Sequence, residues 1–102
     1  METQELTNAE KVTQKVQLVK GDFTPSEASL IIMNLIDEKI NFHKLQRLQV
    51  SESNHTSDTG QLNGRIQELE NEKLIAKAFI KKIRGLGQNL TINGILEISV
   101  AQ

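Results

Sequence analysis

Two helical stretches of similar length restrict the folds that this chain can adopt. The first is expected over about residues 25–50 and the second over about residues 61–85, with a polar turn, SESNHTSDTG, at residues 51–60 between them. At 1.5 Å per residue each helix is roughly 35–40 Å long. Because a short connection places two successive helices antiparallel, the sequence predicts a helical hairpin.

The two helices have clear start and stop signals. Thr24 and Glu27 form a T-x-x-E capping box around Pro25, a residue that suits the first helical turn because its missing N–H has no intrahelical partner there. After the second helix, Gly85 and Gly87 are suited to the C-cap, since glycine adopts the left-handed conformation without strain.

Each helix carries a heptad pattern typical of a coiled-coil-like seam. The first seam is expected at Ala28, Ile31, Leu35, Glu38, Phe42, Leu45 and Gln49, and the second at Leu62, Ile66, Leu69, Lys73, Ala76, Ile80 and Ile83. When the two seams are aligned antiparallel so that each residue of one faces a residue of the other, the charged residues Glu38 and Lys73 fall in the same layer. This pattern predicts a structural polar layer of Glu38 and Lys73, in which the two side chains are either buried as an ion pair or extend to solvent at the edge of the seam.

A second apolar face is expected on the half of the hairpin that is nearer the strands. We predict that this face is an interaction surface, because the seam residues alone do not cover it. Its members are Leu30, Met33 and Ile40 on the first helix and Ile75, Phe79 and Leu86 on the second.

The segments that flank the hairpin have the alternating pattern of half-buried strands, at about residues 12–20 and 90–100. Asn93-Gly94 is also a favoured two-residue hairpin turn. A turn there would split the apolar residues at even positions between two faces, whereas one strand keeps them on a single face. We therefore expect one strand, with Gly94 as a bulge or close-contact point.

The composition points to a thin core. Of the 102 residues, 37% are hydrophobic and three are aromatic, so a domain of this size has few large side chains to bury. The predicted fold class is α+β in β-α-α-β order, with the antiparallel hairpin packed on a short antiparallel sheet. Two strands are marginal alone, so we expect a homodimer to complete the fold by sheet pairing, helix packing or strand swapping, with residues 1–10 as a flexible tail and 11–102 as one domain.

Four basic residues near the end of the second helix, Lys77, Lys81, Lys82 and Arg84, are candidate phosphate contacts for a nucleic acid. No aromatic platform accompanies them, and the formal net charge of −1 gives no overall attraction to nucleic acid. Cationic residues in the last turns of a helix also favour the helix dipole. A solvated face is the interpretation that we favour over a nucleic-acid interface.

Catalytic, metal and cofactor chemistry find no support in the residue pattern. Without cysteine there is no disulfide, thiol nucleophile or cysteine-ligated metal. His43 and His55 have no nucleophile or orienting carboxylate at a suitable spacing, and Glu68, Glu70 and Glu72 alternate around their helix instead of converging. We expect no enzyme activity, no cofactor and no metal site.

The location and role of the protein are inferred only broadly. The polar N-terminal segment METQELTNAEK and the lack of a long apolar run lead us to expect a cytoplasmic protein with no membrane association. The expected function is that of a non-enzymatic homodimeric interaction or structural module, possible protein partners being unidentified. The alternative is a nucleic-acid-binding protein that uses the basic arc from Lys77 to Arg84.

Overall fold

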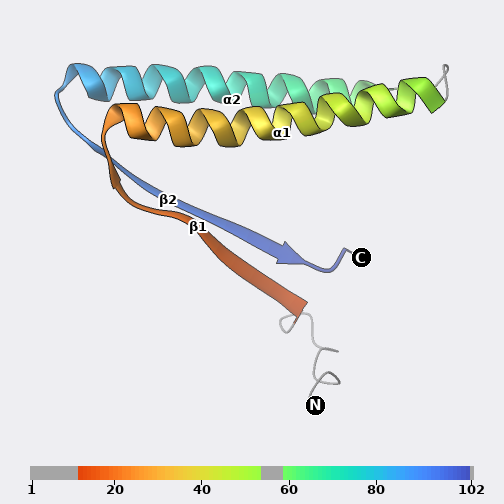
Figure 1. The fold of residues 1–102 in the computed structure, drawn as a ribbon, viewed down its shortest axis with the longest axis horizontal. Coiled ribbons are helices and arrows are strands. Elements are labelled where there is room, and N and C mark those ends of the chain that lie inside the picture. Colours follow the sequence, from red (N-terminus) through yellow and green to blue (C-terminus); the bar gives the residue numbers. More distant parts are fainter. Residues whose placement is uncertain (1–11, 54–58, 102) are drawn as a thin grey trace, which may run out of the picture. The chain divides into compact units, whose positions relative to one another are not determined.

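The computed structural model describes residues 12–53 and 59–101 and confirms the β-α-α-β order. The elements are β1 (Thr13–Phe23), α1 (Pro25–Ser53), α2 (Gly60–Gly85) and β2 (Leu90–Ser99) (Figure 1). The expected tail of residues 1–10 and half of the predicted turn, residues 54–58 with His55, lie outside the described residues. The strands and the helices belong to two compact units, a two-stranded sheet and a helical hairpin.

The start of α1 follows the predicted capping box. The Glu27 amide donates a hydrogen bond to Thr24 Oγ1 at 3.1 Å, and the Thr24 amide donates to Glu27 Oε1 at 2.9 Å. The Ala28 amide continues the pattern by donating to the Thr24 carbonyl at 2.8 Å. These bonds satisfy amide groups that have no partner within the helix, so the chain enters α1 at a fixed position.

The end of α2 is a Schellman motif built on Gly87. Gly87 has a φ of +69°, in the left-handed region that glycine adopts without strain. Its amide donates to the Arg84 carbonyl at 3.0 Å, and the Gln88 amide donates to the Ile83 carbonyl at 3.3 Å. This pair of bonds defines the motif. Of the two glycines expected to suit the C-cap, Gly87 has the special conformation, while Gly85 is the last residue of α2.

The two helices lie side by side and run in opposite directions (Figure 1). All residues of the predicted α2 seam are buried or half-buried, with Ile66 and Ile80 the most enclosed. The predicted α1 seam is wrong after its first two members. The side of α1 that is at least half-buried along its whole length consists of Ser29, Met33, Ile36, Ile40, His43, Arg47 and Val50.

This α1 seam is displaced by one to two residues from the predicted one, and polar cross-links explain the displacement. The Lys73 ammonium lies 2.6 Å from Asp37 Oδ1, and the Arg47 guanidinium donates to Asn63 Oδ1 at 2.6 Å. Apolar residues occur on more than one side of α1, so burial alone does not select a single orientation. The hydrogen-bonded pairs fix the orientation that makes both contacts.

The sheet consists of β1 and β2 and is antiparallel (Figure 1). The expectation that residues 90–100 form one strand is confirmed, because β2 continues through Asn93 and Gly94. A Cβ built on Gly94 would lie 3.7 Å from Val19 Cβ, an ordinary van der Waals distance, and Gly94 does not have a positive φ. Gly94 therefore sits beside its neighbouring strand without needing the freedom of glycine.

The strand register places apolar residues on both faces of the sheet. Thr91 Oγ1 donates to Asp22 Oδ1 at 2.7 Å, and the adjacency of Val19 and Gly94 follows the same register. Because successive side chains of a strand alternate between faces, Leu18 shares a face with the odd-numbered residues of β2. The apolar residues at even positions in the two strands thus lie on opposite faces.

Candidate functional site

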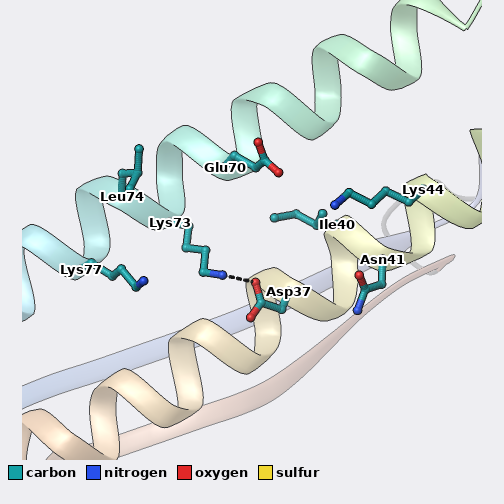
Figure 2. A pocket seen from close by; sticks show the side chains of 8 residues that line it. All are labelled: Asp37, Ile40, Asn41, Lys44, Glu70, Lys73, Leu74 and Lys77. Carbon is teal, nitrogen blue, oxygen red and sulfur yellow. Dashed lines mark hydrogen bonds and ion pairs between the residues drawn. The ribbon is translucent and has the colours of Figure 1, made fainter.

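An open groove of about 340 Å³ runs between the middle parts of α1 and α2, and we call it the central groove (Figure 2). Its lining is mostly charged or polar and consists of Asp37, Ile40, Asn41, Lys44, Glu70, Lys73, Leu74 and Lys77. Figure 2 shows the Lys73 ammonium joined to Asp37, with Lys44 and Glu70 further along the groove. Three cations and two carboxylates nearly balance, so the central groove has no strong preference for one sign of charge.

Lys73 has Asp37 as its ion-pair partner, not the predicted Glu38. The Lys73 side chain is 28% exposed and that of Asp37 is 44% exposed, so the pair is half-buried at the edge of the seam. Glu38 lies on an exposed part of α1. Lys73 therefore occupies the seam of α2 as predicted, but its acid is Asp37, which lies at the edge of the α1 seam.

A second groove of about 340 Å³, which we call the end groove, lies nearer the start of α1 and the end of α2. It is lined by Ser29, Lys77, Ile80, Lys81 and Arg84. Three of the four residues in the predicted basic arc thus come together, while Lys82 lines neither groove. The sequence already indicated this grouping, because residues four and seven positions apart share one side of a helix. Lys77, Lys81 and Arg84 have this spacing, and Lys82 does not.

The predicted interaction face separates into two groups. Met33 and Ile40 are part of the α1 seam, where Ile40 is buried, and so they are not a free surface. The remaining members are all more than half exposed, namely Leu30, Ile75, Phe79 and Leu86.

Sequence reasoning missed a different exposed surface on α1. Leu35, Phe42 and Leu45 are 45%, 52% and 61% exposed, although their heptad spacing had placed them in the seam with α2. We call these three residues the α1 stripe. The Lys39 ammonium lies 5.1 Å from the centre of the Phe42 ring, close enough for a cation–π contact at the edge of the stripe. Helix α1 therefore has two heptad seams, one that packs on α2 and one that is largely exposed among the described residues.

His43 is a half-buried residue of the α1 seam. Its Nδ1 lies 2.8 Å from Gln46 Oε1, and its ring packs edge-on against Phe42 with centroids 5.6 Å apart. Its buried Nε2 has no hydrogen-bond partner among the described residues. Among the described residues, neither a nucleophile nor a carboxylate is hydrogen-bonded to the His43 ring.

The described residues contain no group of three or more histidine, aspartate or glutamate side chains arranged to hold a metal ion. Within the same residues, neither helix has a stretch long and apolar enough to cross a bilayer. Within the described residues, the two grooves and the α1 stripe are candidate sites.

Comparisons with known proteins found no matching family model, no similar curated protein and no similar solved structure.

Proposed function

We propose that this protein is a non-enzymatic homodimeric interaction module whose two subunits join through the α1 stripe. The observation that carries this proposal is the second heptad seam of α1, formed by Leu35, Phe42 and Leu45, which is exposed while the first seam packs on α2. Heptad spacing of apolar residues is the pattern with which helices pack on each other. The α1 helix of a second copy has the same heptad spacing, so its stripe can pack on the α1 stripe of the first.

The surplus of exposed apolar surface supports a partner of this kind. Among the described residues, the buried apolar ones are Ala28, Ile40, Ile66, Ile80 and Leu90, and exposed large apolar side chains outnumber them. Removing apolar surface from water contributes about 25 cal/mol per Å². Covering the α1 stripe therefore adds stabilisation that the small core of one subunit does not supply.

Charge complementarity favours a second copy over an unrelated partner. Glu38 and Lys39 are adjacent, exposed and opposite in charge, and they lie between Leu35 and Phe42. A two-fold axis between positions 38 and 39 of antiparallel α1 helices pairs Glu38 with Lys39 of the partner subunit and the reverse. The same axis places Leu35 against Phe42 of the partner subunit. Such a self-complementary patch is what a two-fold interface needs.

The test is the solution mass, measured by light scattering on a size-exclusion column over a range of concentrations. We expect a dimer of about twice the 11.4 kDa chain mass. Phe42→Ser should shift this dimer to monomer while helical circular dichroism is retained. Leu48→Ser is the matched control, because Leu48 is an equally exposed apolar residue of α1 outside the stripe.

A charge exchange tests the two-fold pairing itself. Glu38→Lys should weaken the dimer because like charges would then face each other across the axis, and adding Lys39→Glu should restore it. A wild-type protein that stays monomeric at every concentration overturns the proposal. Equal weakening by Leu48→Ser and Phe42→Ser overturns the assignment to the α1 stripe.

A further inference from the structure

We propose that the end groove binds the phosphate group of a small organic phosphate. The groove brings Lys77, Lys81 and Arg84 of α2 together with Ser29 of α1. These residues lie outside the α1 stripe, so the proposal does not depend on the dimer.

The cations of the end groove are not neutralised by protein carboxylates. No acidic residue lines the groove, and the ion pairs found among the described residues are Arg65–Glu68 and Lys73–Asp37. Lys77, Lys81 and Arg84 therefore have no carboxylate within ion-pair distance in the part of the chain that the structure describes. Lys77 also lines the central groove with Asp37 and Glu70, whereas Lys81 and Arg84 line only the end groove, and like charges placed together in this way attract an anion.

Hydrogen-bond donors suited to phosphate surround this groove. The Arg84 guanidinium is held beside α1, where its Nη2 lies 3.5 Å from Ser26 Oγ. The planar guanidinium matches two phosphate oxygens at once, and the lysine ammonium groups act as point charges. The Ser29 hydroxyl can donate a further hydrogen bond from the α1 side.

Helix-dipole stabilisation does not account for the whole cluster. Lys82 and Arg84 lie in the last turn of α2, where a positive charge favours the dipole. Lys77 lies two turns before the end of α2, and the dipole effect falls off within the last turn. The helix dipole therefore does not account for Lys77 and Lys81, and a shared anion gives them a role beyond that of a solvated face.

The size of the groove indicates an organic phosphate instead of the free ion. A volume of about 340 Å³ exceeds what phosphate alone fills and lies in the range of small-molecule sites. Ile80 is only 4% exposed and so offers little surface to a ligand. The space beyond the phosphate group is therefore the reason for expecting an attached organic group.

The experiment is a titration of the full chain, followed by two-dimensional ¹⁵N–¹H NMR, with phenyl phosphate and inorganic phosphate as probes at constant ionic strength. We expect saturable shifts of the Ser29, Lys81 and Arg84 amides, with phenyl phosphate the tighter ligand. Lys81→Gln and Arg84→Gln should each weaken phenyl phosphate by about tenfold, the loss expected for a charge-assisted hydrogen bond. Lys82→Gln is the matched control and should change the affinity by less than about twofold.

Each other outcome counts against the proposal. Amide chemical-shift changes that do not saturate would mean that the lysines and arginine respond only to ions in bulk solution. Equal changes in Lys82→Gln and Lys81→Gln would mean the same. Inorganic phosphate binding as tightly as phenyl phosphate overturns the organic ligand. Random duplex DNA that competes with phenyl phosphate and loses affinity equally on changing Lys81 or Lys82 assigns the basic residues to nucleic acid instead.

Discussion

The Lys73 ammonium lies 2.6 Å from Asp37 Oδ1, and this ion pair identifies the side of α1 that faces α2. Glu38, one residue further along, points to another side of the helix because each residue of an α-helix turns by about 100°. Whether Asp37 or Glu38 meets Lys73 therefore distinguishes two rotations of α1. The rotation that is found leaves the α1 stripe exposed.

A double-mutant cycle between Asp37→Asn and Lys73→Gln should give a coupling free energy of about 0.5–1 kcal/mol, as expected for a pair that is partly exposed. Thermal or urea unfolding followed by circular dichroism supplies the four stabilities. The same cycle with Glu38→Gln in place of Asp37→Asn is the control and should give a coupling near zero. Strong coupling of Glu38 and weak coupling of Asp37 would restore the rotation that the heptads predicted.

Ile40→Ala should cost about 2–4 kcal/mol of unfolding free energy, because Ile40 is buried in the hairpin and its truncation leaves a cavity. Leu45→Ala should cost less than about 1 kcal/mol when it is measured at concentrations where the protein is monomeric, since Leu45 is mostly exposed. Urea unfolding curves of both variants and the wild type provide the comparison. The opposite order of costs would contradict the observed α1 seam.

His43→Leu should stabilise the hairpin by about 1 kcal/mol. The substitution removes the buried Nε2 that has no partner among the described residues, and it adds an aliphatic side chain to the seam. The measurement is the urea midpoint, with the slope of the transition unchanged. Gln46→Ala is a useful comparison, because it removes the partner of Nδ1 and should lower the midpoint. A His43→Leu protein less stable than the wild type would mean that the ring is satisfied in solution.

Two glycines of the α2 region should respond in opposite directions to alanine. Gly64→Ala should stabilise the protein by about 0.5–1 kcal/mol, because a Cβ meets nothing within 4 Å and alanine is the better helix former. Gly87→Ala should destabilise it by about 1–2 kcal/mol, because the left-handed φ of Gly87 strains any residue with a Cβ. Melting temperatures of the two variants, read against the wild type, check both signs. A gain in both would show that Gly87 leaves the Schellman conformation at little cost.

The parts of the fold that depend on nearby residues were predictable from the sequence. The Thr24 and Glu27 capping box and the glycine stop after α2 are local devices, so their residue types are sufficient evidence. The ends of the strands and helices found in the structure lie within three residues of the expected ones. The α2 seam also follows the predicted heptad spacing, while the apolar residues Ile75 and Phe79 on another side of α2 are exposed.

The rotation of α1 was not predictable from the pattern alone. Apolar residues such as Leu35 and Ile36 fall on neighbouring sides of this helix, so two seams satisfy the same heptad rule. The choice depends on long-range partners such as Asn63 for Arg47, which no local pattern reveals. Both grooves lie between α1 and α2, so their lining depends on the same rotation. For this reason the pattern of one helix could not predict the end groove.

The two ends of the hairpin differ in how many capping hydrogen bonds stabilise them among the described residues. At the end where α1 begins and α2 stops, the capping box and the Schellman motif bind the terminal backbone groups. At the other end, Thr59 makes no side-chain cap hydrogen bond to α2, and the last turn of α1 has no basic residue. Such unequal ends make fraying directional. We expect the amide hydrogens in the first turn of α2, near Leu62, to exchange faster than those near Ala28 and Ile80.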